Sequence, residues 1–269
     1  MSQVVVPKVF FTAETKIDWQ GFRAFLRHLG VPNWVTDAQS DSEYLIEMAG
    51  KSCYMSFSTD LNKNLTRVGT RNNTQYIQDQ IIAVRHGSVL EHASCTFAIA
   101  DVSRVFTHEL VRHRVGVAFS QVSGRFVRTE NIGYPVPSVI AANPRATEVF
   151  DRAFDTMEGW VRELAAIFEI NDPEKYKGKE GMFMKKVLSS AFRRVIGNGQ
   201  ANHIIFTANH RSLRHEIEVR TAESAEEEIR IVFNQIFHEV VTRYPAIYKD
   251  ARMEPKLGHY EITFPASKV

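Results

Sequence analysis

Cysteine is scarce in this sequence, and apolar runs of membrane length are absent from it. The two cysteines among 269 residues, Cys53 and Cys95, belong to no paired motif. They therefore provide neither a disulfide framework nor a cysteine-based zinc site. No apolar run approaches the roughly 20 residues that a membrane-spanning helix requires. We therefore expect no association with a membrane.

An excess of charge of either sign is also missing. The chain carries 33 Lys and Arg against 31 Asp and Glu, which gives a formal net charge of +2. This is too little to indicate nucleic-acid binding by itself, and no RNP, KH or zinc-finger pattern is present. The first residues, MSQVVVPKVFF, lack the basic segment and the cleavage site of a signal peptide. The expected location is the cytoplasm.

Several familiar catalytic signatures are absent. The sequence has no GxSxG nucleophile elbow, no GxGxxG dinucleotide fingerprint and no phosphate-binding P-loop. Ten histidines invite the idea of a zinc site, and His108, Glu109 and His113 imitate a metalloprotease motif. The two histidines are five residues apart rather than four, so their rings diverge on a helix. We expect no bound metal.

What remains is the pattern of an ordinary globular protein, with 44% hydrophobic and 24% charged residues. The apolar spacing and the expected helix caps Ser40, Asn143 and Ser224 predict an α+β fold, and Pro7 is expected to interrupt the first strand. It is a helix-rich single domain, residues 1–269, around a small mixed or antiparallel sheet. Helices are expected over residues 18–29, 40–50, 74–85, 103–116, 143–168, 182–195, 209–220 and 224–245, and strands over 4–11, 93–99 and 203–207. Residues 56–73 are expected to form a surface loop.

The most informative stretch is RHRVGVAFSQVSGR, residues 112–125. Three cationic or titratable side chains, Arg112, His113 and Arg114, close a predicted helix. The loop after them combines hydroxyl, amide and cationic groups. Guanidinium groups bind phosphate through two hydrogen bonds and also stack on flat rings, so this composition favours an anionic ligand with a planar polar ring. The alternative is a helix end whose cations complement the macrodipole.

This stretch resembles the signature of the flavin-dependent thymidylate synthases, the ThyX family. That family has an RHR triplet separated by seven residues from a serine, whereas eight residues, 115–122, separate Arg114 from Ser123 here. HGSVLEH at 86–92 is similar to a second family element, for which a polar turn is the alternative interpretation. ANHRSLRHEIEVR at 208–220 is similar to a third element and by itself reads as an amphipathic helix. AFRRVIGN at 191–198 is similar to a fourth, with Gly197 where proline is usual.

The resemblance implies a site assembled from these four elements. It assigns FAD binding to His86, Ser88, Arg112, His113, Arg114, Gln121, Asn209, Arg211 and His215. It assigns nucleotide binding to Glu109, Gln121, Val122, Ser123, Gly124, Arg125, Arg193 and Arg220. Arg194 remains an alternative to Arg193. Arg220 is also the expected catalytic residue, because a guanidinium stabilises negative charge that develops on the pyrimidine.

The implied reaction is the reductive methylation of dUMP to dTMP with 5,10-methylenetetrahydrofolate and NADPH, in a homotetramer whose chains share active sites. Neither cysteine lies in a recognisable nucleophile setting, which agrees with a flavin route. Two alternatives stay open: UMP as the substrate of the same chemistry, and an RNA-binding module that uses the arginines. The lengthened spacer is expected to form a mobile loop in which the added residue bulges.

Overall fold

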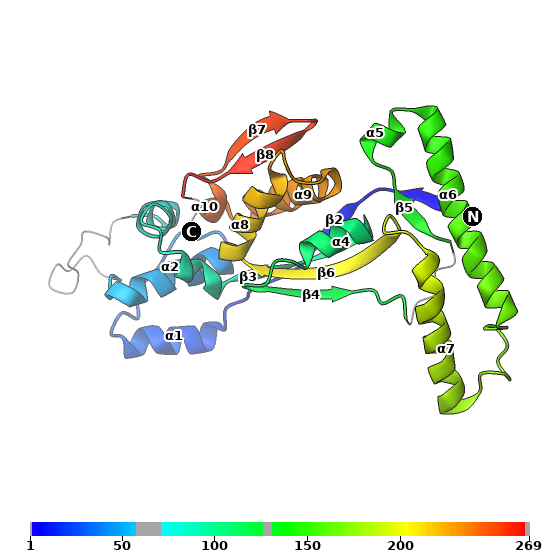
Figure 1. The fold of residues 1–269 in the computed structure, drawn as a ribbon. Helices are drawn as coiled ribbons and strands as arrows, with labels where there is room; N and C mark the ends of the chain where they lie inside the picture. The colour runs from blue at the N-terminus through cyan, green and yellow to red at the C-terminus, as the bar shows by residue number, and fades with distance from the viewer. Residues whose placement is uncertain (1, 58–70, 126–130, 267–269) are drawn as a thin grey trace. The chain divides into compact units, whose positions relative to one another are not determined.

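The computed structural model describes residues 2–57, 71–125 and 131–266. Helices predominate in the described chain (Figure 1). The α-helices are α1 Trp19–His28, α2 Asp41–Tyr54, α3 Asn73–Tyr76, α4 Arg104–Leu110, α5 Ser138–Ala141, α6 Pro144–Ile167, α7 Gly178–Phe192, α8 His210–Thr221, α9 Glu227–Arg243 and α10 Pro245–Tyr248. A π-helical segment, Ile77–Ile82, continues α3, and short 3-10 helices occupy Gly87–His92 and Arg193–Val195. No helix among the described residues is long and apolar enough to cross a membrane.

The strands form three small sheets, as expected for an α+β fold. The largest has the order β2-β3-β6-β4, with β2 Lys8–Glu14, β3 Ser94–Ser103, β6 Ala201–Asn209 and β4 Val117–Gln121. Strand β1 (Gln3–Val5) pairs with β5 (Gly133–Pro135) in parallel, and β7 (Arg252–Lys256) pairs with β8 (His259–Thr263) in the antiparallel sense. The break that Pro7 was expected to introduce lies between β1 and β2, because proline has no N–H to donate to a ladder.

The chain divides into two compact units. The first unit comprises Met1–Val9, Ala98–Arg112 and Phe119–Ile205, and the second comprises Phe10–Phe97, His113–Ala118 and Phe206–Val269. Neither unit is a continuous piece of sequence, and each strand of the largest sheet contributes residues to both. A division of this kind leaves no position at which the chain could be cut into two independent segments.

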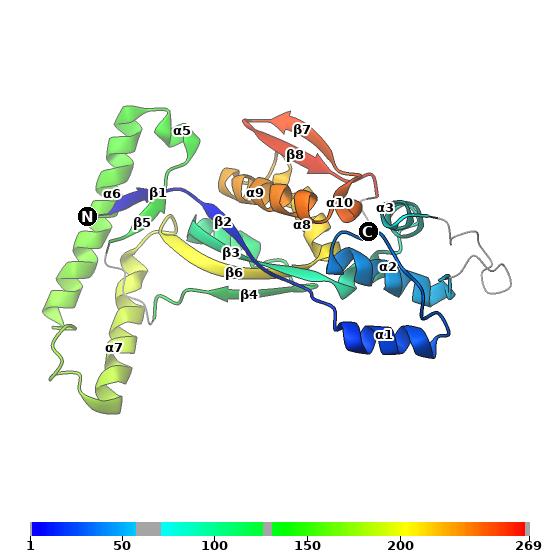
Figure 2. The ribbon, with the colours of Figure 1, turned by 180° about the vertical axis from the view of Figure 1, so that it is seen from behind.

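Helices α6 and α7 lie side by side in the first unit (Figures 1 and 2). Helix α6 begins as predicted, with Asn143 as the N-cap and Pro144 in the first turn. The two helices bury one cluster, formed by Val161, Ile170, Tyr176, Leu188 and Phe192. In a second cluster the rings of Tyr134 and Phe154 stack with their centroids 4.1 Å apart. The outer part of the predicted α6 stripe is exposed, since Val149 and Trp160 keep about half of their surface in solvent.

The second unit has its core where α8 and α9 cover the ends of β3 and β6 that belong to this unit, residues 94–97 and 206–209. The ring of Phe206 lies 6.2 Å from Phe97 and 6.3 Å from Phe233, centroid to centroid. The β7–β8 hairpin lies beside α8 and α9 in both views (Figures 1 and 2). Helix α2 starts at Ser40, whose hydroxyl accepts a hydrogen bond from the Glu43 N–H, so the predicted cap is confirmed.

Several predicted boundaries were wrong. Helix α2 continues past Gly50 to Tyr54. Helix α9 is capped by Glu226 rather than Ser224, because the Glu226 carboxylate accepts from the N–H groups of Glu228 and Ile229. The predicted loop 56–73 falls largely outside the described residues. Local sequence marks a helix end only loosely, and tertiary contacts set the last turn.

The central stretch shows the largest correction. Helix α4 ends at Leu110, so residues 112–114 follow the helix instead of closing it. The spacer is not a mobile loop either: Val117–Gln121 is strand β4, at the edge of the four-stranded sheet. The Val122 N–H donates to the His203 carbonyl at one end of the pair, and the Asn209 N–H donates to the Gly116 carbonyl at the other. These ladder hydrogen bonds with β6 outweigh the glycine and the weak local helix signal.

Candidate functional site

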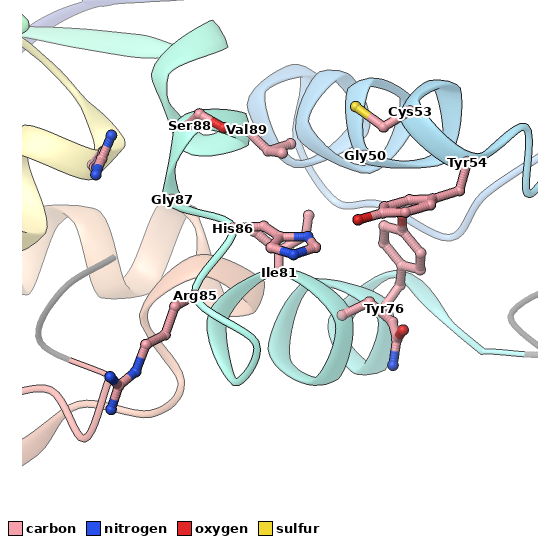
Figure 3. Close-up of a pocket in the computed structure, with 12 residues that line it drawn as sticks. Gly50, Cys53, Tyr54, Tyr76, Ile81, Arg85, His86, Gly87, Ser88 and Val89 are labelled. Atoms are coloured by element: carbon pink, nitrogen blue, oxygen red, sulfur yellow. The ribbon is translucent and has the colours of Figure 1, made fainter. Parts of the chain in front are cut away.

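A cavity of about 380 Å3 opens in the second unit (Figure 3). It lies among α2, the π-helical segment, the 3-10 helix Gly87–His92 and the start of α8. His86, Ser88 and Arg211, all expected in the site, line this cavity together. They were predicted from two separate sequence motifs, and the fold brings them together around one cavity.

Aromatic rings form much of this cavity, and two of them, Tyr54 and Tyr76, were not predicted from the sequence. Figure 3 shows the rings of Tyr54, Tyr76 and His86 turned toward one another. Tyr54 and His86 lie nearly parallel, with an interplanar angle of 16° and 6.0 Å between ring centroids. Burial raises the pKa of Tyr76 to about 12, so its hydroxyl keeps its proton. Gly50 allows this packing, because a Cβ there would lie 2.9 Å from the Tyr76 hydroxyl.

A local signal places Tyr76. Asn72 caps α3 by accepting from the Gln75 N–H, and the Gln75 side chain accepts from the Asn72 N–H in return. This reciprocal capping box was visible in the sequence as N-x-x-Q and would have marked the helix start one turn before Tyr76.

The start of α8 fixes two predicted residues. Asn209 ends β6 and caps α8, with its side-chain oxygen accepting from the Ser212 N–H at 2.8 Å. Arg211 pairs with Glu91 at 2.5 Å, and both side chains are about two-fifths exposed. An exposed pair of this kind contributes little to stability, so Arg211 exchanges one anionic partner for another at low cost.

Helix α8 also carries His215 and Arg220 to His113. The Arg220 Nε–H donates to His113 Nε2 at 2.8 Å, and the His215 ring lies edge-on to His113 with 6.4 Å between centroids. Burial, then the charges of Arg220 and His215, lower the pKa of His113 to about 4. His113 is therefore an uncharged acceptor at neutral pH, in contrast to the guanidinium groups of Arg112 and Arg114 on either side of it.

Gly116 permits the close approach that brings this cluster together. It has a φ of +70°, and a Cβ at this position would lie 2.3 Å from the Asn209 side-chain nitrogen and 2.4 Å from the Ser212 hydroxyl. The Ser212 hydroxyl donates to the Val115 carbonyl at 2.6 Å. Only glycine satisfies both the backbone angle and the space.

The remaining predicted residues, apart from Arg114, belong to the first unit. The Gln121 side-chain amide donates to the Thr107 hydroxyl at 3.0 Å, and the Arg125 N–H donates to the Ser123 hydroxyl at 3.3 Å. The Arg193 side chain crosses Gly124, since a Cβ there would meet Arg193 Cδ at 3.3 Å. The predicted residues at the end of β4 thus lie beside Arg193. Glu109 is half-buried on α4, and Arg112 and Arg114 are exposed.

A second cavity, of about 260 Å3, lies in the first unit. Val122 and Gly124 from the predicted nucleotide set line it. Its charged members, Asp101 and Arg104, flank the end of β3, and His203 belongs to β6; none of the three was predicted from the sequence. No local motif marks them, because pairing between β3 and β6 brings them together. Among residues 2–57, 71–125 and 131–266, no three His, Cys, Asp or Glu side chains are grouped so that they could hold a metal ion.

Comparison with known proteins gives consistent matches. The family model described as thymidylate synthase complementing protein, Thy1, matches residues 35–246. The flavin-dependent thymidylate synthase of Corynebacterium efficiens is 36% identical over 222 residues, which are 82% of this chain and 84% of that protein. The flavin-dependent thymidylate synthase of Mycobacterium marinum is 33% identical over 239 residues, 89% and 90% of the two chains.

Solved structures agree on the fold. The UMP/dUMP methylase PolB from Streptomyces cacaoi, bound with 5-Br UMP, has a TM-score of 0.63 at 16% identity and covers 93% of this chain and 96% of its own. ThyX from Helicobacter pylori, with FAD and dUMP, has a TM-score of 0.53 at 18% identity and covers 91% and 98%. The motifs at 86–92, 112–125 and 208–220, the fold and these identities lead to one conclusion: the chain belongs to the flavin-dependent thymidylate synthase (ThyX) family.

Proposed function

We propose that this protein catalyses the FAD-dependent reductive methylation of dUMP at C5, giving dTMP. The methyl carbon comes from 5,10-methylenetetrahydrofolate and the reducing equivalents come from NADPH. The observation that carries the proposal is the cluster on α8, where a guanidinium is fixed by an uncharged imidazole. Family membership over more than four-fifths of the chain supports the same reaction.

The residues of the second unit suit FAD. The cavity of about 380 Å3 has the volume and the aromatic lining of a cofactor site, with Ser88 and Arg211 as polar groups at its edge. His86 and Tyr54 present flat rings to a flat heterocycle. We assign Arg112, Arg114 and Asn209 to the phosphates and the rest of the cofactor, and Gln121 and His215 to further contacts. When bound, FAD supplies the two-electron reduction that the reaction requires.

The first unit has positively charged side chains that suit the phosphate of the nucleotide. Arg193 crosses Gly124, and Arg104 lines the cavity that Gly124 and Val122 also line. A guanidinium that crosses a glycine, with no Cβ to obstruct it, and a second guanidinium in the cavity that this glycine lines suit a phosphate dianion. We assign the phosphate to Arg193, Arg104 and the turn made by Ser123 and Arg125, and the polar side chains of Glu109 and Gln121 to the nucleoside.

Arg220 is the residue proposed to act on the pyrimidine. Its Nε–H is held by His113, so the plane of the guanidinium is set before the nucleotide binds. A preorganised cation stabilises negative charge that develops on the uracil ring and makes C5 a better nucleophile. Because burial keeps His113 uncharged, the imidazole orients the guanidinium without adding charge of its own. Cys95 is unsuited to act as a nucleophile, since it is buried and burial raises the pKa of its thiol. Cys53 is exposed and lines the cavity assigned to FAD.

The two units are proposed to act as one catalytic domain in a homotetramer whose subunits share their sites. UMP is a second candidate substrate, favoured by the eight-residue spacer before Ser123, which is one residue longer than is usual in the family. In that case the product is 5-methyl-UMP and every residue keeps its role. The choice between the two nucleotides depends on the sugar.

The test is reconstitution with purified protein. It should be yellow or bind FAD from solution, and it should convert dUMP to dTMP only when methylenetetrahydrofolate and NADPH are both present. Product is measured by chromatography, and flavin reduction is followed separately by absorbance. A folded protein that binds no flavin and retains RNA would support the RNA-binding alternative. Binding of FAD without methylation of dUMP or UMP would contradict the proposed reaction.

A further inference from the structure

Asp101 has a backbone conformation that most residues avoid. Its φ is +60° in strand β3, two residues before the strand ends. Glycine adopts such angles without cost, and Asp and Asn tolerate them better than other residues. Among these three, aspartate alone adds a negative charge. The feature to explain is therefore the carboxylate of Asp101. This residue lines the cavity of the first unit.

The two charged groups of this cavity have no partner among the residues that the structure describes. Within residues 2–57, 71–125 and 131–266, no group forms a hydrogen bond or an ion pair with the Asp101 carboxylate or the Arg104 guanidinium. Both residues are partly buried, and they stand three positions apart around the junction of β3 and α4. Opposite charges that line one cavity without pairing are available to a ligand that has both an anionic group and hydroxyl donors.

His203 adds a donor of known position on its ring. The Asp101 N–H donates to His203 Nδ1 at 3.2 Å, so Nδ1 carries no proton and the ring proton is on Nε2. The same hydrogen bond fixes Asp101 to β6. Cation, carboxylate and imidazole therefore line a cavity together with Val122 and Gly124 of the proposed nucleotide site.

A nucleoside monophosphate matches this set of groups. Its phosphate suits Arg104, whereas a carboxylate repels phosphate and suits sugar hydroxyls, which donate hydrogen bonds. A carboxylate has two acceptor oxygens, and the neighbouring 2′ and 3′ hydroxyls of ribose can supply two donors. A deoxyribose can supply only one. The cavity volume of about 260 Å3 suits a sugar phosphate rather than a whole dinucleotide cofactor.

We infer that Asp101 accepts a hydrogen bond from the 2′-hydroxyl of a ribonucleotide and so determines the preference between UMP and dUMP. The inference rests on the proposed function, since it names the residue of that same site that distinguishes ribose from deoxyribose. Asp101 touches the substrate but takes no part in the methyl transfer.

The experiment compares kcat/KM for UMP and dUMP in the FAD-loaded enzyme and in Asp101→Gly. Glycine suits the φ of +60°, so this variant should fold at least as well as the parent. Loss of a charge-assisted hydrogen bond should lower the UMP to dUMP ratio by about 10- to 100-fold. Asp101→Asn, which keeps one acceptor oxygen but no charge, should give a smaller decrease. Glu148→Gln, which removes an exposed carboxylate on α6, should leave the ratio unchanged.

Two outcomes would overturn the inference while leaving the proposed function in place. One is an equal loss for both nucleotides in Asp101→Gly, which would assign the carboxylate to the 3′-hydroxyl that both share. The other is a parent enzyme that methylates dUMP and neither binds nor methylates UMP. If neither nucleotide is methylated, the proposed function fails, and calorimetric affinities for UMP and dUMP in the parent and in Asp101→Gly still decide the role of Asp101.

Discussion

Replacing Arg220 tests the chemical step directly. The structure holds its guanidinium at one end by the 2.8 Å hydrogen bond from Nε to His113, and the lowered pKa of His113, about 4, keeps that acceptor uncharged through the neutral range. Arg220→Ala removes a preorganised cation from a site that is partly shielded from water. Loss of a donor of this kind costs about 10²- to 10³-fold in rate, or about 2.7–4 kcal/mol.

The assay separates the two halves of the reaction. Flavin reduction by NADPH is followed by absorbance without oxygen, and dTMP formation is measured by chromatography after rapid quenching. Arg220→Ala should reduce methylation by the factor above and leave flavin reduction detectable. Arg220→Lys keeps a positive charge but not the planar fork that meets His113, so it should fall between alanine and the parent. Arg252→Ala, an exposed position on β7, is the matched control.

Two results would refute the assignment of Arg220. An equal loss of both half-reactions would mean that the residue supports flavin binding or folding in general. Unchanged methylation would mean that the pyrimidine is activated elsewhere. A melting temperature close to that of the parent is required before either result is interpreted, because Arg220 lies one helical turn from the buried Glu216.

Four further outcomes are expected. Arg112→Ala should weaken FAD binding by about 10- to 100-fold in a fluorescence titration. Unchanged affinity would mean that Arg112 has only a structural role in the turn after α4. The pKa of His113 is lowered from 6.5 to about 4, so between these pH values the unfolded chain binds a proton that the folded chain does not. The free energy of unfolding, measured by urea titration, should therefore keep its full value above pH 6.5 and decrease by up to about 3 kcal/mol as the pH falls toward 4. Burial raises the pKa of Glu216 from 4.5 to about 8, so its favourable contribution to stability is present below pH 4.5 and is lost as the pH rises to 8. Glu216→Gln should therefore have a higher melting temperature than the parent at pH 8 and a smaller difference at pH 5. An equal difference in melting temperature at both pH values would contradict the shift. Gly116→Ala should destabilise the protein by more than about 1 kcal/mol and weaken FAD binding, because its Cβ would overlap the cap amide of α8. Gly30 has a similar φ of +75°, and no atom of the described residues lies within 4 Å of a Cβ added there, so Gly30→Ala should show the backbone cost alone.

Sequence determined what depends on neighbours along the chain. Asn143 and Pro144 start α6, Ser40 starts α2 and Pro7 separates two strands, because caps and proline act within one turn. The alternation over residues 93–99 gave the centre of β3, since a half-buried strand shows a period of two. The family motifs supplied most of the residues that we propose for the site, although not their arrangement.

Tertiary structure decided where chain segments meet, and with it the site. Strand β4 exists because β6 supplies its hydrogen bonds, so a stretch with glycine and no strong local preference became a sheet edge. Tyr54 and Tyr76 join His86 because α2 packs against the π-helical segment through Gly50. Asp101 and His203 are 102 positions apart and meet by strand pairing. Periodicity and capping carry no information about partners so far away in the chain, and the cavities are made of just such partners.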